Sequence, residues 1–199
     1  TEDIITESSI TEADEMSLPY MFRSYEEMPE LEQKALQLAK GKVLDVGCGA
    51  GNHALYLQNQ NNIDVTAIDI SEGAIEVAQK RGVENARQQN LFEVKTQYDT
   101  ILLLMNGIGI CGKLDRINLF LQHLKTLLNR NGQILVDSSD IIYMFDKEED
   151  GSVWVNSENY YGEVTFTMSY KNETSAPFDW LYLDYNTLNN ACTANGLKC

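Results

Sequence analysis

Long apolar runs, paired cysteines and basic side chains are all scarce in this sequence. No apolar stretch approaches the roughly 20 residues needed to cross a bilayer, and the first residues, Thr1-Glu2-Asp3, lack the basic and then apolar order of a secretory signal. The only two histidines, His53 and His123, are far apart in the chain, so no metal site is expected. Reduced thiols in a cytoplasmic protein are the simplest account of four cysteines without CxxC spacing: Cys48, Cys111, Cys192 and Cys199.

Positive charge is half as frequent as negative charge. The chain has 15 Lys and Arg residues against 30 Asp and Glu residues, a net charge of −15. Nucleic acids and anionic membranes are bound mainly through basic side chains, so we expect neither as a partner. Residues 1–30 hold nine acidic residues and one basic residue, Arg23. We therefore expect an acidic N-terminal arm over residues 1–24, loose over 1–18, followed by a single domain over 25–199.

Short apolar segments alternate with segments of helical period through the middle of the chain. The expected strands cover residues 42–46, 64–69, 86–89, 99–105 and 133–137. The expected helices include residues 25–39, with Leu31, Ala35 and Leu38 on the buried face, and a helix from Ile117 that Asn131-Gly132 closes. Such alternation predicts a doubly wound, mostly parallel α/β sheet with helices on both faces.

The pattern changes after Asp140. Residues 163–170 alternate between apolar and polar, which is the period of a half-buried strand, and 178–185 form a possible returning strand. We expect an antiparallel hairpin addition at about 160–185, attached to the main sheet. A final helix is expected over 186–195, ended by Gly196.

A glycine-rich turn follows the first parallel strand. Its frame, from Gly47 through Gly49 to Gly51, is GxGxG, with Asp45 two residues before it and Asn52 after it. A dinucleotide-binding turn has the frame GxGxxG instead, so a nicotinamide dehydrogenase is disfavoured. The turn opens a helix at the carboxyl end of a parallel strand, where open α/β sheets bind ligands.

Residues 43–51 resemble the first motif of class I S-adenosylmethionine-dependent methyltransferases, the Rossmann-like family. The resemblance continues through residues 67–71, Asn90-Leu91 and 98–107, so it covers about residues 25–140 in the family's order. It implies a methyltransferase of the small-molecule type with S-adenosylmethionine as cofactor. The family continues with two more strands after the final helix, and their absence predicts a shortened chain with an open sheet edge that favours a homo-oligomer.

The resemblance also implies the role of each cofactor-binding residue. Asp45 would hold the cofactor's ammonium group, Asp69 the two ribose hydroxyls, and Ile70 one face of adenine. Asn90 stands where the family often has Asp, and its amide oxygen can still accept a hydrogen bond from adenine. The implied cofactor-binding set is Asp45, Gly47, Cys48, Gly49, Gly51, Asp69, Ile70, Asn90, Leu91 and Asn106.

No catalytic base is assigned from the sequence. The residues considered for the acceptor side are Asn106, Asp137, Ser138, Ser139, Asp140, Tyr143, Tyr160 and Tyr161, and those considered for a lid over the cofactor are Tyr20, Arg23 and Tyr25. His53 is expected to be structural and His123 unrelated to the chemistry. The leading hypothesis is methyl transfer to an unidentified small molecule, and two alternatives stay open: an aminopropyl transferase, with Asp137 and Asp140 facing a polyamine, and a non-catalytic S-adenosylmethionine-binding module.

Overall fold

The computed structural model describes residues 3–155 and 159–199, and the chain forms two compact units. Unit 1 comprises Thr1–Leu18, Ile108–Gln122 and Ser138–Cys199, and unit 2 comprises Pro19–Gly107 and His123–Asp137. The first two residues of the predicted acidic arm lie outside the described residues. None of the helices in the described ranges is both long and apolar enough to cross a membrane.

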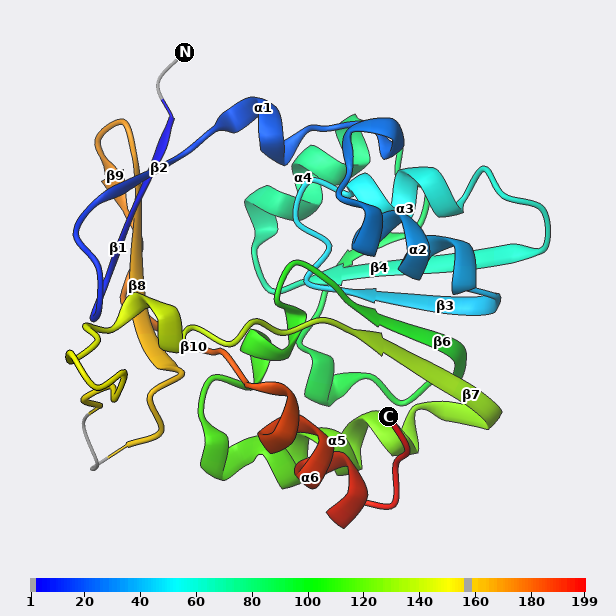
Figure 1. The fold of residues 1–199 in the computed structure, drawn as a ribbon. Helices are drawn as coiled ribbons and strands as arrows, with labels where there is room; N and C mark the ends of the chain where they lie inside the picture. The colour runs from blue at the N-terminus through cyan, green and yellow to red at the C-terminus, as the bar shows by residue number, and fades with distance from the viewer. Residues whose placement is uncertain (1–2, 156–158) are drawn as a thin grey trace. The chain divides into compact units, whose positions relative to one another are not determined.

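Unit 2 contains an entirely parallel five-stranded sheet, which confirms the predicted α/β class (Figure 1). Its strand order is β5-β4-β3-β6-β7. The strands are β3 (Gly41–Val46), β4 (Ile63–Asp69), β5 (Ala86–Gln88), β6 (Tyr98–Leu103) and β7 (Leu128–Val136). The central strands are buried on both faces, which explains why their sequences are continuous apolar runs.

The helices α2 (Glu30–Leu38), α3 (Asn52–Leu57) and α4 (Glu72–Lys80) gather over one face of this sheet (Figure 1). Val43, Ala67 and Leu102 from the strands share one apolar core with Leu36, Ala54, Leu57 and Ala78 from the helices. Ser71 caps α4 by accepting a hydrogen bond from the Ala74 amide. The remaining elements of this unit include the single turns η1 (Tyr25–Glu27) and η2 (Leu91–Glu93), most of α1 (Leu18–Met21) and the end of α5 (Ile117–Thr126).

The predicted buried face of α2 is wrong. Leu31 and Leu38 are 58% and 49% exposed, whereas Glu32 and Leu36 are buried together with Ala35. The helix therefore turns a charged side chain inward, because Glu32 finds ionic partners there. Apolar periodicity alone could not identify this face, since it assigns every acidic residue to the solvent side.

The end of α5 and the beginning of β7 also differ from the prediction. The helix ends at Thr126, and the strand already begins at Leu128. Asn131 lies within β7 with a φ of 64°, at an irregularity in the pairing with β6, so Asn131-Gly132 interrupts a strand rather than closing a helix. Both residue types tolerate a left-handed backbone, which a bulge can use as well as a helix end.

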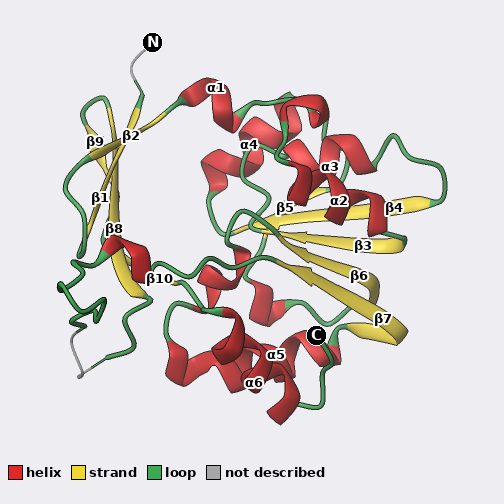
Figure 2. Cartoon of the chain, viewed as in Figure 1, coloured by secondary structure: helices red, strands yellow, loops and turns green. Residues whose placement is uncertain are grey.

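Unit 1 contains a second, antiparallel sheet with the path β10-β8-β1-β2, and β9 pairs with β8 (Figure 2). The strands are β1 (Ile4–Ser8), β2 (Asp14–Met16), β8 (Glu163–Tyr170), β9 (Glu173–Thr174) and β10 (Phe178–Leu181). The unit also holds α6 (Tyr185–Ala194) and the short 3-10 helices η4 (Leu114–Arg116) and η5 (Ile142–Met144). A third 3-10 helix, η3 (Gly107–Cys111), belongs to this unit except for its first residue, Gly107.

This second sheet corrects two expectations. Residues 4–16 are not a loose arm, because β1 pairs with both β2 and β8. The predicted hairpin is present, since Phe178 pairs with Phe166 in antiparallel register, but it belongs to this separate sheet and not to the parallel one. The partner of β1 lies about 160 residues further along the chain, a pairing that no local sequence pattern encodes.

Candidate functional site

The glycine turn between β3 and α3 has three residues with left-handed backbone. The φ angles of Gly47, Gly49 and Gly51 are 70°, 52° and 82°. A Cβ on Gly51 would lie 2.6 Å from Cγ2 of Val83, so glycine is needed there for packing. A Cβ on Gly49 would meet no described protein atom within 4 Å. The turn therefore presents bare backbone to open space at Gly49, as a ligand lying against the main chain requires.

Asp45 lies near the end of β3, on the same side of the strand as Val43, and is 2% exposed. Its Oδ2 atom has no hydrogen-bond partner among the described residues. Burial raises the pKa of Asp45; the positive field of His53 opposes this shift, and the negative charge of Asp69 adds to it. Asp45 is thus a buried carboxylate next to the turn, and His53 compensates its charge only in part.

Asp69 ends β4 beside the same turn. Its Oδ2 accepts a hydrogen bond of 3.0 Å from the Gly49 amide, and its Oδ1 accepts one of 2.9 Å from the Ser71 amide. The next residue, Ile70, is 73% exposed, which is unusual for a large aliphatic side chain following a buried strand. The structure therefore brings together three features of the predicted site: the glycine turn, the second acidic residue and an exposed apolar side chain.

Asn90 caps the single turn η2. Its side-chain oxygen accepts a 2.9 Å hydrogen bond from the Phe92 amide. Leu91 is buried, and its carbonyl oxygen lies 2.8 Å from Nε2 of His123, whose ring lies 5.1 Å from that of Phe92. Asn90 is therefore held in place by its capping hydrogen bond, and Leu91 by a contact with His123. The sequence analysis expected His123 to be unrelated to the chemistry.

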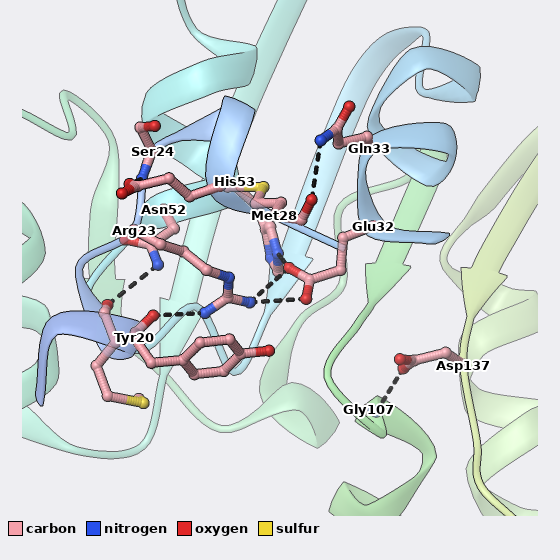
Figure 3. A network of polar contacts seen from close by, with 12 residues as sticks. Tyr20, Arg23, Ser24, Met28, Glu32, Gln33, Asn52, His53, Gly107 and Asp137 are labelled. Carbon is pink, nitrogen blue, oxygen red and sulfur yellow. Dashed lines mark hydrogen bonds and ion pairs between the residues drawn. The ribbon is translucent and has the colours of Figure 1, made fainter. Parts of the chain in front are cut away.

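Asn106 follows β6 in a turn of unusual backbone. Met105 and Asn106 have φ angles of 62° and 57°, a conformation that side chains other than glycine seldom adopt. The next amide, that of Gly107, donates a 3.0 Å hydrogen bond to Oδ1 of Asp137 at the end of β7 (Figure 3). Asp137 therefore fixes the turn after β6. Consecutive strained residues at a strand end are common in functional sites.

The expected lid residues lie in different environments. Arg23 is 4% exposed and donates hydrogen bonds to both carboxylate oxygens of Glu32 (Figure 3). Tyr25 is stacked on Tyr56, with ring centroids 3.9 Å apart. Tyr20 is 43% exposed, and the Arg23 guanidinium lies 4.0 Å from its ring centroid. Arg23 is thus held by an ion pair and Tyr25 by ring stacking, and the expected lid stays a prediction.

Two buried residues lie near Asp45: Glu32, which the sequence analysis did not consider, and His53, which it expected to be structural. Nε2 of His53 lies 2.8 Å from Oε2 of Glu32, and Nδ1 lies 4.0 Å from Oδ1 of Asp45. Burial opposes the charge of Glu32, but hydrogen bonds from His53 and Arg23 outweigh burial and lower its pKa. Glu32 precedes Ala35 and Leu36 by three and four residues, so the three side chains share one helical face, but only the fold shows that this face is buried.

Cys48 occupies the glycine turn as a buried thiol. Its side chain lies next to the carboxylates of Asp45 and Asp69 in an environment that disfavours a thiolate. Burial, followed by these two negative charges, raises the pKa of Cys48 well above its usual range. Cys48 is therefore a buried thiol whose surroundings disfavour the reactive thiolate form.

In unit 1, several polar residues considered for the acceptor side have hydrogen-bond partners within that unit. The Tyr160 hydroxyl donates a 2.6 Å hydrogen bond to Asp184, and the Tyr161 hydroxyl donates a 2.8 Å bond to Asp140. Ser138 both donates to and accepts from the Leu183 backbone at 2.8 Å. These contacts assign structural roles to Ser138 and Tyr160, while Tyr143 is 70% exposed.

A shallow hollow of about 380 Å³ lies elsewhere in unit 2. It borders Ile63, where β4 begins, whereas the glycine turn borders the end of β4 at Asp69. Parallel α/β sheets bind ligands at the carboxyl ends of their strands. The hollow is therefore not the candidate cofactor site.

Comparisons with known proteins agree with this geometry. Residues 43–132 match the family described as methyltransferase domain. The chain is 46% identical to a SAM-dependent methyltransferase from Bacteroides fragilis, solved in complex with S-adenosyl-L-homocysteine. That match has a TM-score of 0.91 and covers 99% of this chain and 80% of the other.

Two further matches have lower sequence identity or cover less of the chain. A sugar N-methyltransferase from Streptoalloteichus shares the fold, with a TM-score of 0.57, 14% identity and coverage of 84% of this chain and 77% of that one. An uncharacterized protein from Synechococcus is 36% identical over 87 residues, which are 43% of this chain. The matched segment is 19% of that relative, so this chain aligns with only about a fifth of its length. The near-complete match at 46% identity decides the family: this chain belongs to the S-adenosylmethionine-dependent methyltransferases.

Proposed function

We propose that this chain transfers a methyl group from S-adenosylmethionine to a small-molecule acceptor, with the cofactor lying against the glycine turn of unit 2. The observation that carries the proposal is the buried Asp45 carboxylate, whose Oδ2 has no hydrogen-bond partner in the described part of the chain. An unpaired buried oxygen is costly, and an ammonium group would supply the missing donor. When bound, the cofactor supplies an electrophilic methyl group, and the chain supplies binding and alignment.

Five further residues of the predicted cofactor-binding set then have a physical role. The open space in front of Gly49 accommodates the amino-acid end, and Asp69 is oriented by two backbone amides so that its oxygens can also accept from ribose hydroxyls. Ile70 offers an exposed apolar surface to adenine. The capping oxygen of Asn90 keeps a second lone pair for the adenine amino group, beside the backbone amide of Leu91.

The acceptor we propose is a neutral or cationic small molecule. Unit 1 carries 17 acidic and 5 basic residues, so most of the chain's negative charge lies in this unit. An anionic macromolecule such as RNA would be repelled by this field, whereas a neutral compound or an amine would not. No residue is proposed as a general base, because alignment and exclusion of water can supply much of the catalysis of a direct displacement.

An acidic polyamine pocket, which an aminopropyl transferase would need, is less well supported. Asp137 accepts a hydrogen bond from the Gly107 amide, and Asp140 accepts from the Tyr161 hydroxyl and the Ile142 amide. These two carboxylates belong to different units and have separate structural partners. We therefore retain methyl transfer as the proposed reaction.

Calorimetric titration with S-adenosylhomocysteine tests the cofactor part of the proposal. We expect a Kd in the micromolar range, which corresponds to about −8 kcal/mol, and loss of binding in Asp69→Ala. NADH should not bind. Tight binding of NADH, or equal binding of S-adenosylhomocysteine by wild type and Asp69→Ala, would contradict the proposed site.

Turnover tests the enzymatic part. S-adenosylhomocysteine formation should be followed with panels of neutral alcohols, phenols and amines, alongside an RNA and a peptide pool. The proposal expects product with at least one small compound. Tight cofactor binding combined with no turnover on any panel would favour the non-catalytic binding module.

A further inference from the structure

A chain of charged side chains runs through the interior of unit 2 and ends at Asp45 (Figure 3 shows its first three members). Arg23 lies 2.7 and 2.6 Å from the two carboxylate oxygens of Glu32. Oε2 of Glu32 lies 2.8 Å from Nε2 of His53, and Nδ1 of His53 lies 4.0 Å from Oδ1 of Asp45. The imidazole therefore lies between two carboxylates, with one ring nitrogen toward each.

The four members come from four separate segments. Arg23 precedes η1, Glu32 belongs to α2, His53 is the second residue of α3, and Asp45 is the last residue but one of β3. All four are buried, with exposed fractions of 7% or less. Removing so many charged groups from water costs more than apolar packing of similar volume, so the network is not the simplest way to stabilise this core.

The two ends of the network, Arg23 and Asp45, differ in their hydrogen bonding. At one end, Arg23 also donates a 2.7 Å hydrogen bond to the Tyr20 carbonyl, and Asn52, next to His53, donates one of 3.0 Å to the Met21 carbonyl (Figure 3). The end of α1 is thereby fixed to the start of α3. At the other end, Oδ2 of Asp45 is nine-tenths buried and has no partner among the described residues.

The balance of charge in the network indicates which kind of ligand group can bind Oδ2 of Asp45. Arg23 balances one of the two carboxylates, Glu32, and the remaining excess of negative charge is on Asp45, which only the 4.0 Å contact with His53 partly compensates. A cationic group of a ligand would complete the balance. A Cβ on Gly49 would meet no described atom within 4 Å, so the glycine turn that follows Asp45 borders open space on which a ligand can lie.

We propose that Arg23, Glu32 and His53 are positioning residues that hold the Asp45 carboxylate for the ammonium group of the cofactor. The inference rests on the proposed function. It adds that this network selects ligands that carry the complete amino-acid end, because a ligand without an ammonium group has nothing to place against Oδ2 of Asp45. The network acts only through Asp45 and does not touch the adenosine part of the ligand.

Two ligands separate this role from a purely structural one. S-adenosylhomocysteine carries the ammonium group, and methylthioadenosine lacks the whole amino-acid end. Affinities for both should be measured by calorimetry for wild type, Glu32→Gln and His53→Gln. Glu30→Gln is the matched control, since it makes the same chemical change on the exposed side of the same helix.

We expect Glu32→Gln and His53→Gln to bind S-adenosylhomocysteine about tenfold more weakly and methylthioadenosine within twofold of wild type. Glu30→Gln should match wild type for both ligands. His53→Gln keeps the Arg23–Glu32 ion pair, so it tests the same link if Glu32→Gln proves too unstable to fold. Equal weakening for both ligands, or no weakening in His53→Gln, would overturn the inference.

A double-mutant cycle provides a second measure. If His53 acts through Asp45, then His53→Gln should weaken S-adenosylhomocysteine binding in wild type but have no further effect in Asp45→Asn. Additive effects would overturn the inference. Failure of the wild-type chain to bind S-adenosylhomocysteine would instead overturn the proposed function on which the inference rests.

Discussion

Single carboxylates of the same chemistry have very different roles in this chain because their surroundings differ. Glu32 is compensated by a guanidinium and an imidazole, so its pKa is lowered, whereas burial and a neighbouring acid raise the pKa of Asp45. Asp69 is held by two backbone amides at the open edge of the turn. A raised pKa of a buried carboxylate is a recognised signature of a functional residue.

Asp45→Asn should stabilise the free protein and weaken cofactor binding. The pKa of Asp45 is higher in the folded than in the unfolded state, so its ionised form destabilises the fold at every pH above the unfolded value near 3.8. Removing that charge should raise the melting temperature at pH 7. Loss of one charged hydrogen bond should weaken S-adenosylhomocysteine binding by about 10- to 100-fold.

Calorimetry and thermal melts check both effects, with the exposed Asp64→Asn as control. A lower melting temperature for Asp45→Asn would show that the free protein already satisfies this carboxylate.

Alanine at two positions of the glycine turn should separate folding from binding. Gly51→Ala forces a methyl group to within 2.6 Å of Val83, and such overpacking costs about 1–3 kcal/mol in addition to the left-handed backbone. Gly49→Ala adds only the backbone cost, about 1–2 kcal/mol, but projects a methyl group into the proposed ligand space. Urea unfolding should rank Gly51→Ala as less stable, and Gly49→Ala should lose S-adenosylhomocysteine binding while remaining folded.

The companion change Val83→Ala should recover part of the stability of Gly51→Ala by making room for the methyl group. Equal stability of the two alanine variants would contradict the packing argument.

Each of several secondary-structure elements of unit 2 contributes one or two residues to the buried network that ends at Asp45. The helix α2 illustrates this, because its inward face combines an acid with apolar residues and is rotated from the face that periodicity predicts. Its role is to present Glu32 to Arg23 and His53 while Leu36 packs in the core.

Leucine-to-alanine substitutions test the corrected orientation of α2. Leu36 is 2% exposed, so Leu36→Ala should destabilise the protein by about 2–5 kcal/mol. Leu31 is 58% exposed, and Leu31→Ala should change stability by less than about 0.5 kcal/mol. Urea denaturation of the two variants provides the measurement. A large loss for Leu31→Ala would restore the face predicted from the sequence.

At the scale of the whole molecule, the two units divide the charge and the motifs between them. The segments that resemble the family motifs, 43–51, 67–71, 90–91 and 98–107, lie in unit 2, and unit 1 carries the larger acidic excess and the antiparallel sheet. A strongly negative net charge disfavours a compact state by self-repulsion. The buried ion pairs of unit 2 must remain ionised against this background.

The contribution of Glu32 to global stability should depend on pH. Its folded pKa is lowered, so its stabilisation is complete above the unfolded value near 4.5 and is lost as the pH falls through the folded value. At pH 7, Glu32→Gln should be less stable than wild type by about 3–5 kcal/mol, as for other broken buried pairs. The difference between the two proteins should shrink below pH 4.5.

Urea denaturation at pH 7, 5, 4 and 3.5 measures this difference, with Glu30→Gln as the surface control. A difference that stays constant over the whole range would mean that ionisation of Glu32 does not contribute.

The sequence by itself determined the parallel α/β class, the order of its elements and the family. These features depend on local signals: continuous apolar strands, the GxGxG turn with Asp45, and Asp69 at the end of the next strand. Because such signals lie within a few residues of one another, they can be interpreted without knowing the fold. The individual cofactor contacts inferred from them stay predictions.

Only the tertiary structure decided which side chains meet from distant parts of the chain. It paired β1 with β8, turned Glu32 inward, and placed Arg23, His53 and Asp45 in one buried network. A buried charge depends on its partners, and these partners are supplied by segments that no local pattern links. The balance between burial and compensation, which leaves Asp45 without a full counter-charge, therefore exists only in the folded chain.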